Sequence, residues 1–226
     1  MCRVLLGIDS TPGWCSDKQI MRDYKRFGIK QEQWLVLDTA SYDRWVRKRL
    51  QPLTDSMRQT GISNDSDVAR QLLKPFRDDL QPVQFRYFTA NEEPVLKLVN
   101  CYIDPPIPIR WNIDGSFNQH PPRHNIEMLN KNQHPLSDLL PHIHQLDGRA
   151  ADLTALDSAD FVAVVFFNRF MIRPSRKLIK TLEAYRQQHH DVNMAVFYVH
   201  NQNSTLWPRL NAKQQEQIKE NYLKHP

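Results

Sequence analysis

Two continuous apolar runs dominate the hydrophobic pattern of this chain. Residues 161–167 read FVAVVFF and residues 194–199 read MAVFYV. Runs that lack polar alternation and are rich in β-branched and aromatic residues are typical of strands covered on both faces. The segment 174–190 between them begins with a proline suited to a first helical turn and carries Leu178, Ile179, Leu182 and Tyr185 at helical spacing. The pattern predicts two neighbouring parallel strands joined by a crossover helix.

The rest of the chain alternates between strand and helix in the same way. Strands are expected at 4–8, 34–37 and 83–88, and helices at 17–27, 41–59, 65–80 and 214–223. Ser16 and Gln19 have the spacing of a capping box, while Pro52 and Pro75 are expected to kink or divide their helices. Segments 95–103 and 107–113 fit either a strand or a short helix. Together these elements predict an α/β fold with an open, mostly parallel sheet and helices on both faces.

One stretch of this pattern resembles a known family. Leu153, Leu156, the run Asp157-Ser158-Ala159-Asp160, the strand that follows, and 195–199 are similar to the latter half of a TIR domain and to other flavodoxin-type sheets, including nucleoside deoxyribosyltransferases. The resemblance implies a flavodoxin- or TIR-like three-layer fold. Catalytic TIR domains carry a glutamate in the helix after this strand, and that position falls near Lys177 here. The resemblance therefore does not predict NAD-cleaving chemistry.

The length suits one α/β domain over 1–226, with a C-terminal βαβ portion at 125–226. A proline-rich stretch at 104–124 is predicted to form a long loop or a lid. The three cysteines show no metal-binding or disulfide spacing, which favours a reducing compartment. The longest apolar run is too short to cross a bilayer, and the N-terminus lacks the order of a secretion signal. We therefore expect a cytoplasmic protein without a membrane span.

The chain is basic, with a formal net charge of +5 and a pI near 9.1. Such a charge favours contact with nucleic acid, anionic lipid or acidic proteins through a field effect. The lysines and arginines are spread along the sequence, whereas a dedicated duplex binder concentrates them on one surface. The charge therefore permits these partners without selecting one.

The turn after the 161–167 strand is the strongest local signal for a site. Ligands of doubly wound sheets lie beyond the carboxyl ends of strands, where a following helix presents unpaired N–H groups. Cations at that helix end are locally unfavourable, so an anion would relieve both effects. The predicted anion- or nucleotide-binding residues are Asn168, Arg169, Arg173, Ser175, Arg176 and Lys177. The alternative is a solvated basic turn whose arginines pair with acidic residues elsewhere.

The other candidate residues fit structural roles better than catalytic or metal-binding ones. The five histidines at 120, 124, 134, 142 and 144 lack diagnostic ligand spacing, so no metal site is predicted. Cys2 could be an N-terminal nucleophile, but no partner set accompanies it, and a place in the first strand suits it better. Asp9 and Asp38 could hold a metal or nucleotide at a strand end, although capping is the commoner role. No catalytic set and no cofactor are expected.

Three functional classes remain. The first, which the missing catalytic set favours, is a non-catalytic adaptor or accessory subunit that contacts a protein partner through Trp14, Trp111 and Trp207. The second is an enzyme or sensor that binds a nucleotide or another phosphorylated small molecule at the 168–177 turn. The third is a nucleic-acid-binding protein that uses this turn and the basic segment 44–49.

Overall fold

The protein is built around one six-stranded sheet with the order β3-β2-β5-β6-β1-β4. The computed structural model describes residues 15–30, 34–63, 66–100, 111–112, 115–123, 133–169, 171–201 and 211–224. The strands are β1 (Leu35–Leu37), β2 (Gln84–Thr89), β3 (Pro94–Val99), β4 (Ile143–Gln145), β5 (Phe161–Phe167) and β6 (Met194–His200). The helices are α2 (Asp17–Phe27), α3 (Thr39–Gln59), α4 (Asp67–Asp79), α5 (Ile172–Gln188) and α6 (Ala212–Lys224).

The expectation of an open, mostly parallel sheet of the flavodoxin or TIR type is wrong. Only β5–β6 and β6–β1 pair in parallel, whereas β2–β3, β2–β5 and β1–β4 are antiparallel. One cause is the short connection 90–93, which joins β2 to β3 as a hairpin. A parallel pair needs a crossover of a dozen or more residues. The strand β3 lies in the segment 95–103 that the sequence left ambiguous.

The β5–α5–β6 unit is confirmed. β5 and β6 run parallel over their full length, with Phe161 opposite Met194 and Phe167 opposite His200, and α5 is the crossover. The capping box of α2 is also confirmed, since Ser16 and Gln19 each bond to the backbone of the other. Pro52 and Pro75 do not divide their helices, because α3 and α4 each continue through the proline.

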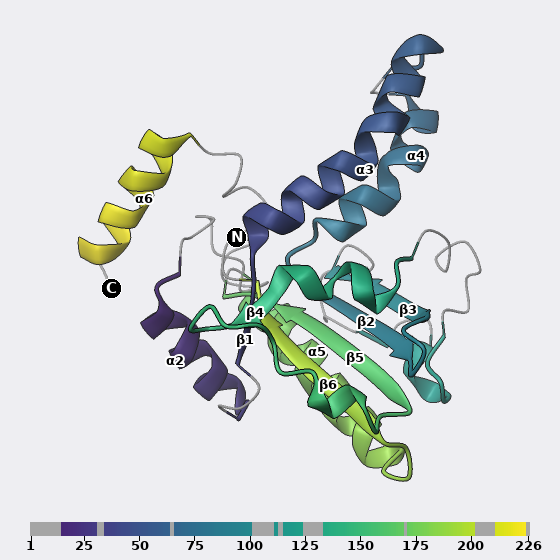
Figure 1. Cartoon of the computed structure of the whole chain (residues 1–226), viewed down its shortest axis with the longest axis vertical. Coiled ribbons are helices and arrows are strands. Elements are labelled where there is room, and N and C mark those ends of the chain that lie inside the picture. The colour runs from purple at the N-terminus through teal and green to yellow at the C-terminus, as the bar shows by residue number, and fades with distance from the viewer. Residues whose placement is uncertain are drawn as a thin grey trace.

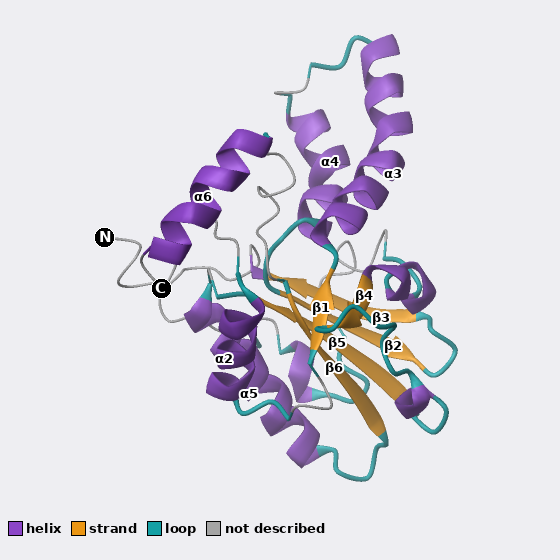
Figure 2. Ribbon diagram, turned by 60° about the vertical axis from the view of Figure 1, so that its left-hand side comes forward, coloured by secondary structure: helices purple, strands orange, loops and turns teal. Residues whose placement is uncertain are grey.

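Helices cover both faces of the sheet, and the sheet separates two apolar cores (Figures 1 and 2). On one face, α2 and α5 bury Ile20, Tyr24, Leu178 and Leu182 against the sheet. On the other face, α3 packs together with short 3₁₀ turns at Leu136–Asp138, Leu140–His142 and Thr154–Leu156. The helical hairpin of α3 and α4 extends beyond this second face (Figure 1).

The hydroxyl of Tyr24 ties α2 to the parallel strands. It accepts hydrogen bonds from the backbone N–H groups of Leu35 at 2.8 Å and His200 at 3.2 Å, and it can donate to the carbonyl of Tyr198 at 2.8 Å. The ring is fully buried, and burial raises the pKa of this phenol far above its ordinary value. Because the hydroxyl stays protonated, it can donate one hydrogen bond while it accepts others. It therefore links α2 to both β1 and β6.

A buried ion cluster fixes the α3–α4 hairpin to the opposite face. The carboxylate of Asp79, at the end of α4, contacts Arg86 at 3.0 Å, Lys97 at 2.5 Å, His134 at 3.3 Å and Arg49 at 3.5 Å. Its side chain is 1% exposed. Burial alone would raise the pKa of Asp79, but the Arg86 charge and the hydrogen bonds of His134 and Lys97 outweigh it and lower that pKa below its usual range. Burial and the Arg86 charge lower the pKa of Lys97 to about 8.

Some sequence-based expectations cannot be compared with the structure. The strand at 4–8, with Cys2 and Asp9, lies outside the described residues, as do residues 104–110, 113–114 and 124 of the proline-rich stretch. Among the described helices, none combines the length and the apolar character needed to cross a membrane.

We predict that Asp79→Asn strongly destabilises the protein. The substitution leaves buried cations without their carboxylate, a change that costs roughly 3–5 kcal/mol. Asp55→Asn is the matched control, because Asp55 is 45% exposed and its pair with Arg58 spans 3.5 Å. An exposed pair of this kind contributes less than about 1 kcal/mol. Urea denaturation followed by circular dichroism measures both values, and equal losses would contradict the anchoring role of Asp79.

Candidate anion-binding surface on helices α2 and α5

The turn predicted to bind an anion is partly closed by its own hydrogen bonds. The hydroxyl of Ser175 accepts from the backbone N–H of Asn168 at 3.1 Å and lies within hydrogen-bond distance of the carbonyls of Asn168 and Met171. The side-chain amide of Asn168 donates to the carbonyl of Asn201. Both Asn168 and Ser175 are buried. The structure therefore places these two predicted binding residues inside the turn, where they hold β5, α5 and the end of β6 together.

Trp111 lies beside the same turn. Its indole N–H donates to the carbonyl of Pro174 at 2.9 Å, and the residue is 4% exposed. The side chain therefore belongs to the hydrophobic core, and its partner-binding role stays a prediction. Trp14 and Trp207 lie outside the described residues.

The remaining predicted residues form part of a basic stripe on α5. Arg173, Arg176, Lys177 and Lys180 are exposed and lie at positions i, i+3, i+4 and i+7 of the helix. This spacing places them along one side. The buried residues of α5, such as Leu178 and Leu182, occupy the other side. Packing of the apolar side against the sheet thus directs the cations outward.

A second basic stripe runs along α2. Lys18, Arg22, Lys25 and Arg26 are exposed, and their spacing places them along one side of the helix. The carboxylate of Asp23 on α2 is buried and pairs with His200 at 3.1 Å, which leaves Asp17 as the exposed acid of this helix. The outward side of α2 is therefore strongly positive.

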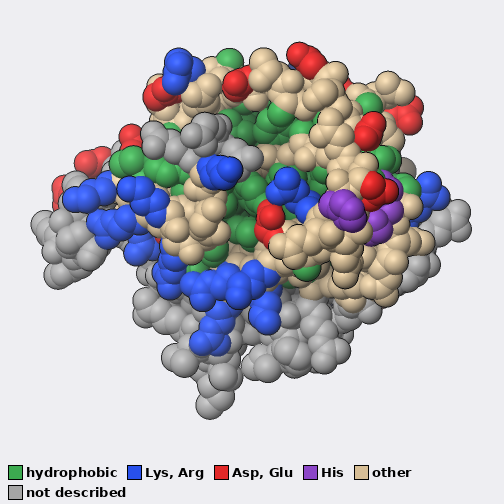
Figure 3. Space-filling view, turned by 90° about the horizontal axis from the view of Figure 1, so that it is seen from below, with side chains coloured by type: hydrophobic (Ala, Val, Ile, Leu, Met, Phe, Trp, Pro, Cys, Tyr) green, Lys and Arg blue, Asp and Glu red, His purple; other side chains and the backbone are tan. Residues whose placement is uncertain are grey.

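The two stripes belong to one surface, because α2 and α5 pack on the same face of the sheet (Figure 2). Arg169, from the turn before α5, is half-buried and lies close enough to the start of α2 to act on the thiol of Cys15. Burial and the nearby Asp23 raise the pKa of that thiol to about 12, while Arg169 opposes the shift. Seen from below, Lys and Arg side chains gather along one side of the molecule (Figure 3).

The α3–α4 hairpin pairs more of its cations than the α2–α5 surface does, although Arg44, Lys48 and Arg77 of the hairpin have no carboxylate within ion-pair distance in the described residues. On the hairpin, Arg47, Arg49, Arg58, Arg70 and Lys74 each contact an aspartate within 3.5 Å. Within the described part of the chain, no carboxylate lies within ion-pair distance of the stripe residues Lys18, Arg22, Lys25, Arg26, Arg176, Lys177 and Lys180. Of the cations predicted in the 168–177 turn, Arg176 and Lys177 belong to this set, and their anion-binding role stays a prediction.

Three of the histidines that cluster in the sequence have different hydrogen-bond or ion-pair partners in the structure, and His124 lies outside the described residues. His134 contacts Asp79, His142 bonds through Nδ1 to the hydroxyl of Ser41 at 2.8 Å, and His120 bonds through Nδ1 to the hydroxyl of Tyr185 at 2.6 Å. The described residues hold no group of three or more side chains suited to a metal ion. Asp38 caps α3 by accepting a hydrogen bond from the backbone N–H of Ser41, which is the capping role considered for it.

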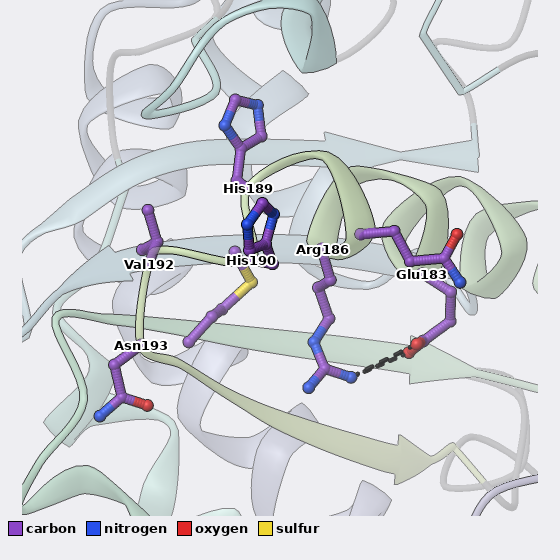
Figure 4. A pocket seen from close by; sticks show the side chains of 8 residues that line it. Glu183, Arg186, His189, His190, Val192 and Asn193 are labelled. Carbon is purple, nitrogen blue, oxygen red and sulfur yellow. Dashed lines mark hydrogen bonds and ion pairs between the residues drawn. The ribbon is translucent and has the colours of Figure 1, made fainter.

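A polar hollow lies at the far end of α5 from the predicted turn (Figure 4). Its charged residues are already engaged, because Arg186 pairs with Glu183 at 3.3 Å and the hydroxyl of Tyr198 also bonds to Glu183. The carboxyl end of a helix is its negative end, which disfavours an anion. The hollow therefore adds nothing to the anion-binding surface.

Sequence reasoning missed the α2 stripe and Lys180. The signal was present, since residues 18, 22, 25 and 26 lie opposite Ile20 and Tyr24 on a helical projection. Neither the partnership of α2 with α5 nor the lack of nearby carboxylates could be read from one sequence.

Comparison with known proteins adds no assignment. No family model matches the chain, and no curated protein or solved structure is significantly similar to it.

We predict that His120 makes the protein less stable in acid. Burial and the neighbouring His189 lower the pKa of His120 below its ordinary value, although Asp191 opposes this. The unfolded chain therefore binds more protons than the folded one below about pH 6.5, and stability is lost as the pH falls through that value. His120→Asn removes the titrating ring. Urea midpoints at about pH 7.5 and 5 should differ less in the variant than in the wild type, and an unchanged difference would contradict the prediction.

Proposed function

We propose that the α2–α5 surface binds the phosphate backbone of a nucleic acid. The observation that carries this proposal is the pair of outward basic stripes on adjacent helices whose cations, apart from Arg173, have no carboxylate within ion-pair distance in the described chain. Lysine and arginine side chains that neutralise phosphates release condensed counterions, which supplies most of the affinity of non-specific nucleic-acid binding.

The free energy that clustered cations cost the unbound protein supports a bound polyanion. Along α5, Arg176 and Lys180 are four residues apart. Like charges at this spacing destabilise a helix by about 0.2–0.5 kcal/mol per pair. The first turn of α5 also contains one cation, Arg173, and no acidic residue at the positive end of the helix dipole. A row of phosphates would relieve both effects.

An extended ligand fits the surface better than a small one. The stripe on α5 spans seven residue steps from Arg173 to Lys180, or roughly 10 Å of helix at 1.5 Å per residue. Asn168 and Ser175, which would have to orient a small phosphorylated ligand at the turn, are buried and hydrogen-bonded to neighbouring backbone groups. The geometry therefore favours a polyanion that lies across both helices.

A protein partner is the second candidate function, and a separate observation favours it. Val68 and Leu72 on α4 are 54% and 40% exposed, and they are the large exposed hydrophobic residues of the described chain. They lie four residues apart and so share one side of the helix. An adaptor role would use this apolar side of the α3–α4 hairpin and would leave the basic surface of α2 and α5 unused.

We predict that the wild-type protein binds a random-sequence oligonucleotide at low salt, with an affinity that falls steeply as salt is added. Arg176→Gln combined with Lys177→Gln removes two exposed cations of the α5 stripe. This change should lower the slope of log affinity against log salt by about 1–2, because each lost phosphate contact contributes roughly 0.7–0.9. Fluorescence anisotropy with labelled single-stranded and duplex oligonucleotides measures the slope.

The matched control removes two exposed cations from the other side of the molecule. Arg44→Gln with Lys48→Gln changes the net charge by the same amount on α3. The control should keep nearly all of the wild-type slope. An equal loss in both variants would show that only the net charge matters, and absence of binding at low salt would overturn the proposed function. Loss of a co-purifying protein on Val68→Ser with Leu72→Ser would favour the adaptor instead.

A further inference from the structure

A groove runs along the side of α2 that faces the turn after β4. Its volume is about 560 Å³, and it is lined by Asp17, Met21, Trp34, Gln145, Leu146, Asp147 and Arg149. Trp34, Met21 and Leu146 are each partly exposed, so they form an apolar floor that solvent can reach. Polar and charged side chains from both walls surround this floor.

Trp34 is held rigidly enough to act as a stacking platform. Its ring stacks on Tyr24 with the centroids 5.5 Å apart and an angle of 20° between the planes. Its indole N–H donates to the carbonyl of Ile29 at 3.2 Å. Since Tyr24 is itself bonded to β1 and β6, the indole is supported from below by the core. A flat ring that enters the groove would meet an aromatic surface that is already in place.

The charges around the groove favour a neutral ligand with hydrogen-bond donors. Arg149 pairs with Asp147 at 2.7 Å and also donates to the side chain of Gln145 at 3.1 Å. The exposed carboxylate of Asp17 adds a negative charge at the other wall. A phosphate would be repelled here, whereas the amino or imino groups of a nucleobase could donate to these carboxylates.

The groove also adjoins the basic stripe of α2. Met21 on its floor is one residue before Arg22 and four before Lys25, and Asp17 on its wall precedes Lys18. Phosphates that lie on this stripe would therefore place their bases beside the groove. Successive aromatic platforms next to a positive track are the usual means of binding single-stranded nucleic acids.

We propose that the groove receives an unpaired nucleobase of a single-stranded nucleic acid whose phosphates lie along the α2 stripe. This inference rests on the proposed function and specifies the form of nucleic acid. Stacking on Trp34 holds the base, and the carboxylates and Gln145 contact its edge. A base within a duplex is stacked between its neighbours, so the groove selects single strands.

The test compares two probes of equal length and charge, an oligothymidylate and a strand of abasic sites, by fluorescence anisotropy in the wild-type protein. Base stacking on an aromatic residue should make the oligothymidylate bind roughly 5- to 100-fold more tightly. Trp34→Leu should reduce this ratio toward one while it leaves the abasic affinity and its salt dependence unchanged. Met21→Phe fills the groove from the surface of α2 without a change of charge, and it should reduce the ratio as well.

Each outcome separates the two proposals. Equal affinity of the wild-type protein for both probes would overturn the base-binding groove and leave the phosphate-binding surface standing. Failure to bind either probe at low salt would overturn the proposed function. A ratio that persists in both Trp34→Leu and Met21→Phe would place the base contact elsewhere. Because the ratio compares two ligands of the same variant, a partial loss of folded protein does not affect it.

Discussion

Packing of the apolar side of α5 onto β5 and β6 is the interaction on which the rest of the structure depends. It makes the two strands parallel neighbours, and it fixes which residues of α5 face solvent. The sheet then extends on one side by the antiparallel β2–β3 hairpin, and on the other by β1, which is parallel to β6, and by the antiparallel β4. The direction of Arg176 and Lys180 thus follows from burial of Leu178 and Leu182.

The two faces of the sheet use charge in opposite ways. Beneath the α3–α4 hairpin, Arg49 from α3, Arg86 from β2, Lys97 from β3 and His134 from the loop before Leu136 converge on the buried carboxylate of Asp79. Such a network fixes the position of elements but presents little charge to a ligand. On the α2–α5 surface, most of the cations are exposed and have no carboxylate within ion-pair distance in the described residues. A protein that needs both a rigid core and an electrostatically attractive surface gains from keeping these uses apart.

The sequence predicted those elements that depend on residues close together along the chain. The apolar runs at 161–167 and 194–199 and the helical spacing of Leu178 and Leu182 were sufficient for the βαβ unit. The sheet order was not predictable in the same way, because β1 and β4 have three residues each and pair across more than a hundred positions. The ion pairs of Arg86 and Lys97 were not predictable either, since their partner Asp79 belongs to a different element. The part of the basic surface at 169–177 was predicted from the sequence. The part on α2 was not, because its place beside α5 follows only from the fold.

The Tyr24 hydroxyl has a consequence for how the surface meets a ligand. By bonding to the backbone of both β1 and β6, it prevents α2 from sliding along the sheet independently of the strands that carry α5. The distance between the cation rows of α2 and α5 is therefore fixed before any ligand binds. Under the proposed function, a flexible polymer would adapt its own shape to that fixed spacing, so most of the ordering entropy on association would come from the polymer and little from the protein.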